Sequence, residues 1–338
     1  MTPTDIHRYT AIIDRFPGCS IAVYGDLVAD EFVFGEFSRI SREAPVLILK
    51  HKESRILPGG AANAINNLKA LEADPIPVGI LGQDAAGKEL HRQLREGKLT
   101  MSLVKRSSDY PTPVKTRFVA GSTHSTRHQV LRLDREGHFQ HTRKTEQNLW
   151  SELVPLLPRC RGIIISDYGL GYVSPTLVAH LAEQRKDLPI TVDSRHQLLQ
   201  FPGLTASTPN EPEVEDLVGY EIGNDKARLQ QAGTHLLRQL KSEAILITRG
   251  RDGMTLFTPR KPPLSIPIFG SDEVADVTGA GDTVIAVFTL ALSVGASFEE
   301  AARLSNYAGG LVVMKRGTAT VTRQELKKAV ARDKASHG

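Results

Sequence analysis

The run SIAVYGD at residues 20–26 is short, apolar and rich in β-branched side chains, and it ends at a glycine and an aspartate. Similar runs recur along the chain: IPVGILG (76–82), GIIISDYG (162–169), LPITVDS (188–194) and EAILITRG (243–250). Such continuous, non-alternating runs are typical of strands buried on both faces, as in a parallel sheet. Helix-like stretches separate them, among them GGAANAINNLKALEA (59–73) and SPTLVAHLAEQRKD (174–187), in which Ser174 is a candidate N-cap ahead of Pro175. The alternation predicts a doubly wound α/β fold, a mainly parallel sheet with helices on both faces.

Two segments depart from this alternation. Residues 32–54 and 112–136 alternate polar and apolar side chains without an intervening helix, as half-exposed antiparallel strands do. We expect them to form a small β lid over one end of the core, and we expect two chains to pair through it as a homodimer. The whole chain, residues 1–338, is then a single domain with this lid.

Composition narrows the class of partner. Lys and Arg number 42 against 38 Asp and Glu in 338 residues, too small and dispersed an excess for a nucleic-acid groove. The N-terminus lacks a signal-peptide pattern, and no window approaches the ~20 apolar residues of a membrane span. Cys19 and Cys160 lie far apart and indicate neither a disulfide framework nor a zinc site. We therefore expect a cytoplasmic protein that binds small molecules, without nucleic-acid or membrane partners.

The segment DVTGAGDTV (276–284) carries the chemistry. Gly279 and Gly281 allow successive backbone N–H groups to point into one small space, and the helix-compatible run from Val284 adds a helix N-terminus, so the turn can bind an anion. The helix dipole would keep Asp282 ionised, as a general base for a hydroxyl that attacks phosphorus. The alternative is a tight turn in which Asp282 merely caps the helix.

Further polar residues follow strands or precede helices. Asp30 ends GDLVAD (25–30), and Gly60 precedes a helix that carries Asn63, so a carboxylate and an amide could hold sugar hydroxyls in one crevice. Asn210 and Glu213 supply hard oxygen ligands suited to Mg²⁺. Taken singly, Asp30 and Asn63 fit a cap or turn better than a binding site, whereas Asn210 and Glu213 fit an N-capping turn and a Mg²⁺ site equally well.

The motifs PGGAAN, SDYGLG, TPNEPE, ITRGRDG and DVTGAGDT, in this order and spacing, resemble the ribokinase (PfkB) family of carbohydrate kinases over about Ser20 to Val330. Within that family, SRISREAP (38–45), RLDRE (132–136) and GTATVT (317–322) most resemble the D-glycero-β-D-manno-heptose 7-phosphate kinases of bacterial ADP-heptose synthesis. The resemblance implies ATP-dependent phosphorylation of the anomeric hydroxyl, with Mg²⁺ as a cofactor and K⁺ as the candidate monovalent cation.

The resemblance also assigns roles by position. It implies that Asp282 is the catalytic base, that Gly279, Ala280 and Gly281 form the anion hole, and that Asp30, Gly60 and Asn63 hold sugar hydroxyls. Glu213 would bind Mg²⁺, directly or through water, beside Asn210. The nucleotide would contact Thr248, Gly250, Gly253 and Asn306, and a monovalent cation would lie at Asp276 and Thr278. Lys115, Arg117 and Arg132 are the best-placed cations for a substrate phosphate, although they could equally be solvated charges of the lid.

The chain departs from the heptose-kinase pattern at two positions. Leu170 stands where a lysine is expected in SDY-x-K-G, and Arg195 stands where the lysine of DPK is expected. Arg195 could still meet a phosphate, whereas Leu170 could not. The departures concern the sugar rather than the phosphoryl transfer.

Two other motifs are misleading. GQDAAGKE (82–89) is one residue short of a Walker A motif, and Glu89 would repel phosphates, so we interpret it as a strand-to-helix turn. HFQH (138–141) lacks the glycine of the H-x-G-H nucleotidylyltransferase motif, and we expect no such domain.

Three other functions stay open. A kinase for another sugar or sugar phosphate is the nearest alternative. A Rossmann oxidoreductase is disfavoured, because AVYGDLVAD lacks the G-x-G-x-x-G turn after the first strand. The third is a catalytically silent sugar-binding protein, against which the retained Asp282 and its glycine turn count.

Overall fold

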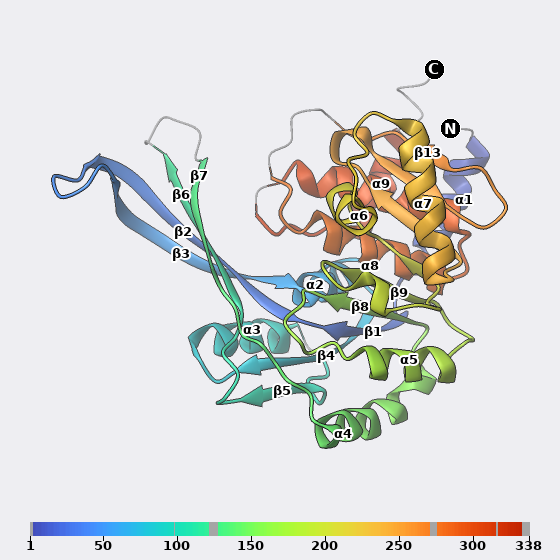
Figure 1. The fold of residues 1–338 in the computed structure, drawn as a ribbon, viewed down its shortest axis with the longest axis horizontal. Helices are drawn as coiled ribbons and strands as arrows, with labels where there is room; N and C mark the ends of the chain where they lie inside the picture. The colour runs from blue at the N-terminus through green and yellow to red at the C-terminus, as the bar shows by residue number, and fades with distance from the viewer. Residues whose placement is uncertain (1–2, 98, 122–127, 271–275, 316, 333–338) are drawn as a thin grey trace.

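The computed structural model describes residues 3–97, 99–121, 128–270, 276–315 and 317–332. A large sheet forms the body of the molecule, and a second sheet leaves it as a long arm (Figure 1). The strands of the body are β1 (Ser20–Gly25), β4 (Asp74–Gly82), β5 (Val104–Ser107), β8 (Gly162–Asp167), β9 (Ile190–Ser194), β10 (Ala206–Ser207), β11 (Ala244–Thr248), β12 (Met254–Phe257) and β13 (Leu264–Ile266). Those of the arm are β2 (Leu27–Ile40), β3 (Leu47–Gly60), β6 (Val114–Gly121) and β7 (His128–Arg135). The helices are α1 (Pro3–Ile13), α2 (Ala61–Ala70), α3 (Ala85–Glu96), α4 (Arg143–Leu153), α5 (Pro175–Gln184), α6 (Glu211–Val218), α7 (Lys226–Leu240), α8 (Ala280–Ser293), α9 (Phe298–Val313) and α10 (Arg323–Arg332).

The body sheet has the strand order β13-β12-β11-β10-β9-β8-β1-β4-β5 and is parallel from β11 to β5, with β12 and β13 antiparallel at one edge. The five apolar runs become β1, β4, β8, β9 and β11, so the predicted α/β class is confirmed. Successive side chains of β1 enter different cores: Val23 packs with helices α2, α8 and α9, whereas Tyr24 packs with α5 and α7. Helices therefore cover both faces of the sheet.

The arm is a mixed sheet with the order β3-β2-β6-β7. The prediction of antiparallel strands is right for β2 with β3 and for β6 with β7, but wrong for β2 with β6, which pair in parallel. The reason is topological, because the chain returns to the body sheet through α2, β4, α3 and β5 between the two hairpins and leaves it again in the same direction. Residues 122–127, which separate β6 from β7 in the sequence, lie outside the described residues.

Local capping agrees with the sequence at two helices. Ser174 caps α5 by accepting a hydrogen bond from the Leu177 N–H, with Pro175 in the first turn. The Walker-like segment is a strand-to-helix turn in which Asp84 caps α3 and accepts from the Gly87 N–H. Within the described ranges, no helix has the length and apolar character needed to cross a membrane.

Candidate active site

Two cavities meet where the parallel strands β8, β9, β10 and β11 end. The smaller, about 380 Å³, lies between these strand ends and the base of the arm, and the larger, about 800 Å³, extends toward α6 and α9. They share Arg195, Asn210, Glu213, Thr248, Val277 and Gly281. The turn that starts α8 therefore lies at their junction, the position that ligands occupy in open α/β sheets.

Most of the predicted site residues line one or both cavities. The smaller cavity is lined by Asp30, Gly60, Lys115, Arg117, Arg132, Arg195, Asn210, Glu213, Thr248, Thr278, Gly279, Gly281 and Asp282. The larger is lined by Arg195, Asn210, Glu213, Thr248, Gly250, Gly253, Ala280, Gly281 and Asn306. Of the remaining two, Asn63 contacts Asp282 directly, and Asp276 lies in the loop that leads to α8.

Asp282 lies in the first turn of α8 with only 3% of its surface exposed. Its two carboxylate oxygens accept hydrogen bonds from Asn63 Nδ2 and from the Tyr168 hydroxyl, both at 2.9 Å. Burial raises the pKa of Asp282 to about 7, while these two hydrogen bonds act in the opposite direction. Burial thus opposes the ionised form that the helix dipole was expected to favour, and it places the pKa of Asp282 well above the usual range of an aspartate.

Gly279 is the N-cap of α8, and its φ of 77° lies in the left-handed region. A Cβ built there would come within 2.3 Å of Asn63 Nδ2, so a glycine is required for packing as well as for conformation. The same Nδ2 donates to the Gly279 carbonyl at 3.2 Å. Asn63, expected to hold a sugar hydroxyl, thus uses its amide N–H groups to tie α2 to the catalytic turn.

Asp30 and Arg117 form a buried ion pair at the base of the arm. The Arg117 guanidinium also stacks over the Phe32 ring, at 5.4 Å from its centroid. Burial raises the pKa of Asp30 in spite of the opposing effect of Arg117. Arg117, predicted as a ligand for a substrate phosphate, is already committed to neutralising Asp30.

Other cations surround a side cavity of about 190 Å³ that adjoins the smaller one. Lys115 lies over the Tyr168 ring at 4.4 Å, and burial lowers the pKa of this lysine. Arg132 pairs with Asp134 at 3.0 Å and remains partly exposed. The wall also contains Arg135, Arg195, His196 and the buried Leu170. Two of these residues, Arg135 and His196, were not singled out from the sequence.

Asn210 and Glu213 form a reciprocal capping box at the start of α6, with both hydrogen bonds at 2.9 Å. The capping interpretation is thus confirmed, and the two residues line both cavities as well. Burial raises the pKa of Glu213, and it raises that of Asp193, beside it in the smaller cavity, well above its usual value.

The carboxylates in the smaller cavity are the candidate ligands for Mg²⁺. Among the described residues, no group of three or more His, Cys, Asp or Glu side chains could hold a metal ion. Mg²⁺ usually keeps several waters and binds one or two carboxylates together with substrate phosphates. Asp193 and Glu213 both line the smaller cavity, and Glu213 is close enough for its negative charge to raise the pKa of Asp193, so the two carboxylates fit that mode.

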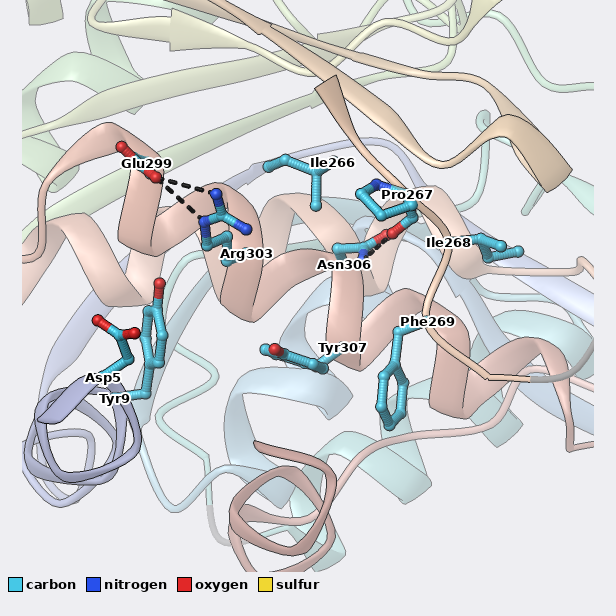
Figure 2. Close-up of a pocket in the computed structure, with 10 residues that line it drawn as sticks. All are labelled: Asp5, Tyr9, Ile266, Pro267, Ile268, Phe269, Glu299, Arg303, Asn306 and Tyr307. Carbon is cyan, nitrogen blue, oxygen red and sulfur yellow. Dashed lines mark hydrogen bonds and ion pairs between the residues drawn. The ribbon is translucent and has the colours of Figure 1, made fainter. Parts of the chain in front are cut away.

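The segments around the larger cavity are fixed by backbone contacts. Gly253 has a φ of 80°, and a Cβ there would meet the Ile266 carbonyl at 2.1 Å. Asn306 donates from Nδ2 to the Pro267 carbonyl at 2.8 Å and so holds the irregular segment that follows β13 against α9 (Figure 2). Asp276 accepts from the N–H groups of Thr278 and Gly317, both at 2.9 Å.

A separate cavity of about 400 Å³ is lined in part by this segment (Figure 2). Aromatic rings of Tyr9, Phe269 and Tyr307 line it, and Arg303 pairs with Glu299 at its edge. Asn306 lies in the wall between this cavity and the larger site cavity. The position of Asn306 fits direct contact with a nucleotide in the larger cavity. It also fits an indirect role, in which Asn306 holds the wall between the two cavities in place.

Sequence reasoning missed three residues of the site. Tyr168 contacts Asp282, Asp193 lies in the smaller cavity, and Asp26 holds the loop that carries Tyr168. The sequence did contain a pattern that could have identified Tyr168 and Asp26, because SDYGLG and GDLVAD both stand at the carboxyl ends of apolar runs that predict buried strands. Because β1 and β8 are neighbours in parallel, their carboxyl ends meet.

A glycine turn at a helix N-terminus, a buried carboxylate and two adjoining cavities define an α/β phosphotransferase that acts on a small molecule. Residues 20–325 match the family model described as pfkB family carbohydrate kinase. The chain belongs to this family.

Comparisons with known proteins agree with this assignment. The bifunctional protein HldE of Desulfatibacillum aliphaticivorans is 37% identical over 330 residues, which cover 97% of this chain and 66% of the relative. HldE of Coxiella burnetii (strain Dugway 5J108-111) is 36% identical over 96% of this chain and 66% of its own length. The chain thus spans about two thirds of the length of these relatives.

Solved structures share the fold at lower identity. Arabidopsis thaliana ribokinase complexed with ribose and ATP has a TM-score of 0.71 at 20% identity, with 93% of this chain and 99% of that one covered. Phosphofructokinase-2 of Escherichia coli in complex with fructose-6-phosphate has a TM-score of 0.72 at 16% identity, with 93% and 98% covered. The predicted ribokinase-like architecture, including the second sheet, is therefore confirmed.

Proposed function

We propose that the protein is an ATP-dependent sugar-phosphate kinase that phosphorylates the anomeric hydroxyl of D-glycero-β-D-manno-heptose 7-phosphate, giving the 1,7-bisphosphate for ADP-heptose synthesis. The observation that carries the kinase proposal is the place of Asp282 and its glycine turn at the junction of two cavities of unequal size. The similarity to HldE and the motifs SRISREAP and RLDRE favour the heptose. A kinase for another sugar phosphate is the alternative, favoured by Leu170 and Arg195.

In this proposal, ATP occupies the larger cavity and the sugar the smaller one. The sugar hydroxyl oxygen attacks the terminal phosphorus, its proton passes to Asp282, and the bond from phosphorus to the ADP oxygen breaks. The backbone N–H groups of Gly279 and Gly281 stabilise the negative charge of the transferred group, and that of Ala280, which donates to the Val277 carbonyl at 3.2 Å in this structure, would join them once it is released. A pKa of about 7 suits a general base that works near neutral pH.

Cations complete the proposed site. Mg²⁺, held by Glu213 and Asp193 through waters, would neutralise charge on the ATP phosphates. Asp276 and Thr278 are the proposed contacts of K⁺ or another monovalent ion.

The side cavity is the proposed place for the sugar's own phosphate. Lys115, Arg132 and Arg195 line both it and the smaller cavity, so a sugar in the latter can extend its far end among them. Arg117 is not part of this proposed phosphate site, because it is paired with Asp30. Asp30 and Gly60 remain the proposed contacts of the sugar hydroxyls.

We also propose a homodimer formed through the arm. Large apolar side chains are exposed on its strands and on the turn between β2 and β3, and a surface of this kind is typical of a protein interface. They are Phe37, Ile40, Val46, Leu47, Val130, Leu131 and Leu133. Sedimentation of the Leu131→Asp variant, expected to be monomeric beside a dimeric wild type, tests this proposal.

The reaction is tested with a substrate panel and one variant. ADP release is measured with heptose 7-phosphate, unphosphorylated heptose, fructose phosphates and ribose, and we expect the highest kcat/KM with heptose 7-phosphate. Asp282→Asn should keep ATP and sugar binding by calorimetry but lose turnover by about 10² or more, the scale of losing a general base. Wild-type turnover in this variant would refute the mechanism, and binding without ADP release in the wild type would indicate a silent sugar-binding protein.

A further inference from the structure

Tyr168 reaches the catalytic carboxylate from the loop that follows β8. Its hydroxyl donates to Asp282 Oδ1 at 2.9 Å, on the opposite oxygen from the one that Asn63 contacts. The ring lies between the Lys115 ammonium, at 4.4 Å from its centroid, and Gly60, where a Cβ would come within 3.2 Å of the ring. The phenol is therefore held in one orientation, with its donor aimed at the base.

The backbone of the Tyr168 loop is also fixed. The N–H groups of Tyr168 and Leu170 both donate to Asp26 Oδ2, at 2.8 and 3.3 Å. Asp26 is fully buried at the end of β1, the strand next to β8. The backbone that carries Tyr168 is thus held by the body sheet, while Lys115 and Gly60 of the arm strands β6 and β3 contact its ring.

We propose that Tyr168 is a positioning residue for phosphoryl transfer: its hydroxyl orients the Asp282 carboxylate toward the sugar hydroxyl and stabilises the ionised form that accepts the proton. This inference rests on the kinase function proposed above. With Tyr168 on Oδ1 and Asn63 on Oδ2, the carboxylate cannot rotate without losing both bonds. The remaining lone pairs are the ones available to substrate.

Some of the groups that face Asp282 raise its pKa and others lower it. Asp30 from the arm raises its pKa, Lys115 lowers it, and the hydrogen bonds from Tyr168 and Asn63 lower it. Asp193 at the end of β9 interacts with the same carboxylate. Burial and Asp282 raise the pKa of the Tyr168 hydroxyl well above its usual value, so it stays a proton donor at every pH of an assay.

The test is the pH profile of kcat at saturating MgATP and sugar for Tyr168→Phe. Without the hydroxyl, the pKa of Asp282 rises above about 7, so its ionised form is populated only at higher pH. We expect the acid limb to move up by about one unit, with an approximately tenfold loss near pH 6 to 7 that is recovered by pH 9, since a hydrogen bond to a charged group is among the strong ones. Tyr110→Phe is the matched control, because the buried Tyr110 hydroxyl has no hydrogen-bond partner among the described residues. Its profile should coincide with that of the wild type.

A second variant covers the case in which Tyr168→Phe folds poorly. Fluorotyrosine at position 168 keeps the shape but makes the phenol a stronger donor, so the acid limb should move to lower pH. Opposite shifts in the two variants support the proposal. An unshifted acid limb, or an equal loss at every pH, would overturn it while leaving the kinase activity of the wild type intact. Absence of sugar phosphorylation by the wild type would instead refute the proposed function.

Discussion

Replacement of Gly279 by alanine tests whether Asn63 and Asp282 act together. The new Cβ would lie 2.3 Å from Asn63 Nδ2, whereas ordinary contacts begin at 3.4 Å, so the amide must retreat by about 1.1 Å. Its hydrogen bond to Asp282, now 2.9 Å, cannot survive that movement. A displacement of about 1 Å at a catalytic group can cost about 10² in rate. We therefore expect kcat to fall about a hundredfold.

The glycine also has a conformational cost that must be separated from this effect. Alanine at a φ of 77° costs about 1–2 kcal/mol of stability. Gly203→Ala is the matched control, because Gly203 has a φ of 78° with no atom within 4 Å of an added Cβ. Both variants should lose this conformational part of the stability in urea unfolding, Gly279→Ala should lose more because it also displaces Asn63, and only Gly279→Ala should lose kcat. Equal kcat values in the two variants would refute the coupling of Asn63 to the base.

Four further substitutions have expected outcomes. Arg117→Ala leaves Asp30 buried without its partner and should cost about 3–5 kcal/mol in urea unfolding, whereas Arg132→Ala, at a partly exposed pair, should cost less than about 1 kcal/mol. Asn210→Ala removes a helix cap and should cost about 1 kcal/mol in the same assay. It should also raise the KM for ATP, since Asn210 lines the larger cavity. Lys88→Ala should leave ATP affinity by calorimetry unchanged, because its Walker-like segment is a helix start that lines neither site cavity.

The body of the fold could be predicted from the sequence because each buried parallel strand is a continuous apolar run. SIAVYGD and GIIISDYG became neighbouring strands whose ends meet. The arm was predicted less completely, because alternation marks a half-exposed strand but does not indicate its neighbour. The parallel pairing of β2 with β6 depends on the path of the whole chain between them.

The sequence predicted which residues lie near the site better than it predicted which side chains they contact. Arg117 and Asp30 were both selected, yet for separate ligands, because no local pattern shows that two side chains 87 positions apart will pair. Asn63 was selected as an amide facing the crevice, and only the packing of α2 against α8 shows that it contacts Asp282. A pKa set by burial likewise depends on the assembled core.

The arm lines one side of the proposed catalytic centre and also contributes charges to it. Asp30 on β2 raises the pKa of Asp282, and Lys115 on the adjacent strand β6 lowers it. Arg117 neutralises Asp30, so it limits the first of these effects. If Arg117 is lost, the uncompensated Asp30 should raise the pKa of Asp282 further, and the acid limb of the pH profile should move to higher pH. Charged residues on the arm therefore influence how readily Asp282, the proposed base in α8, accepts a proton.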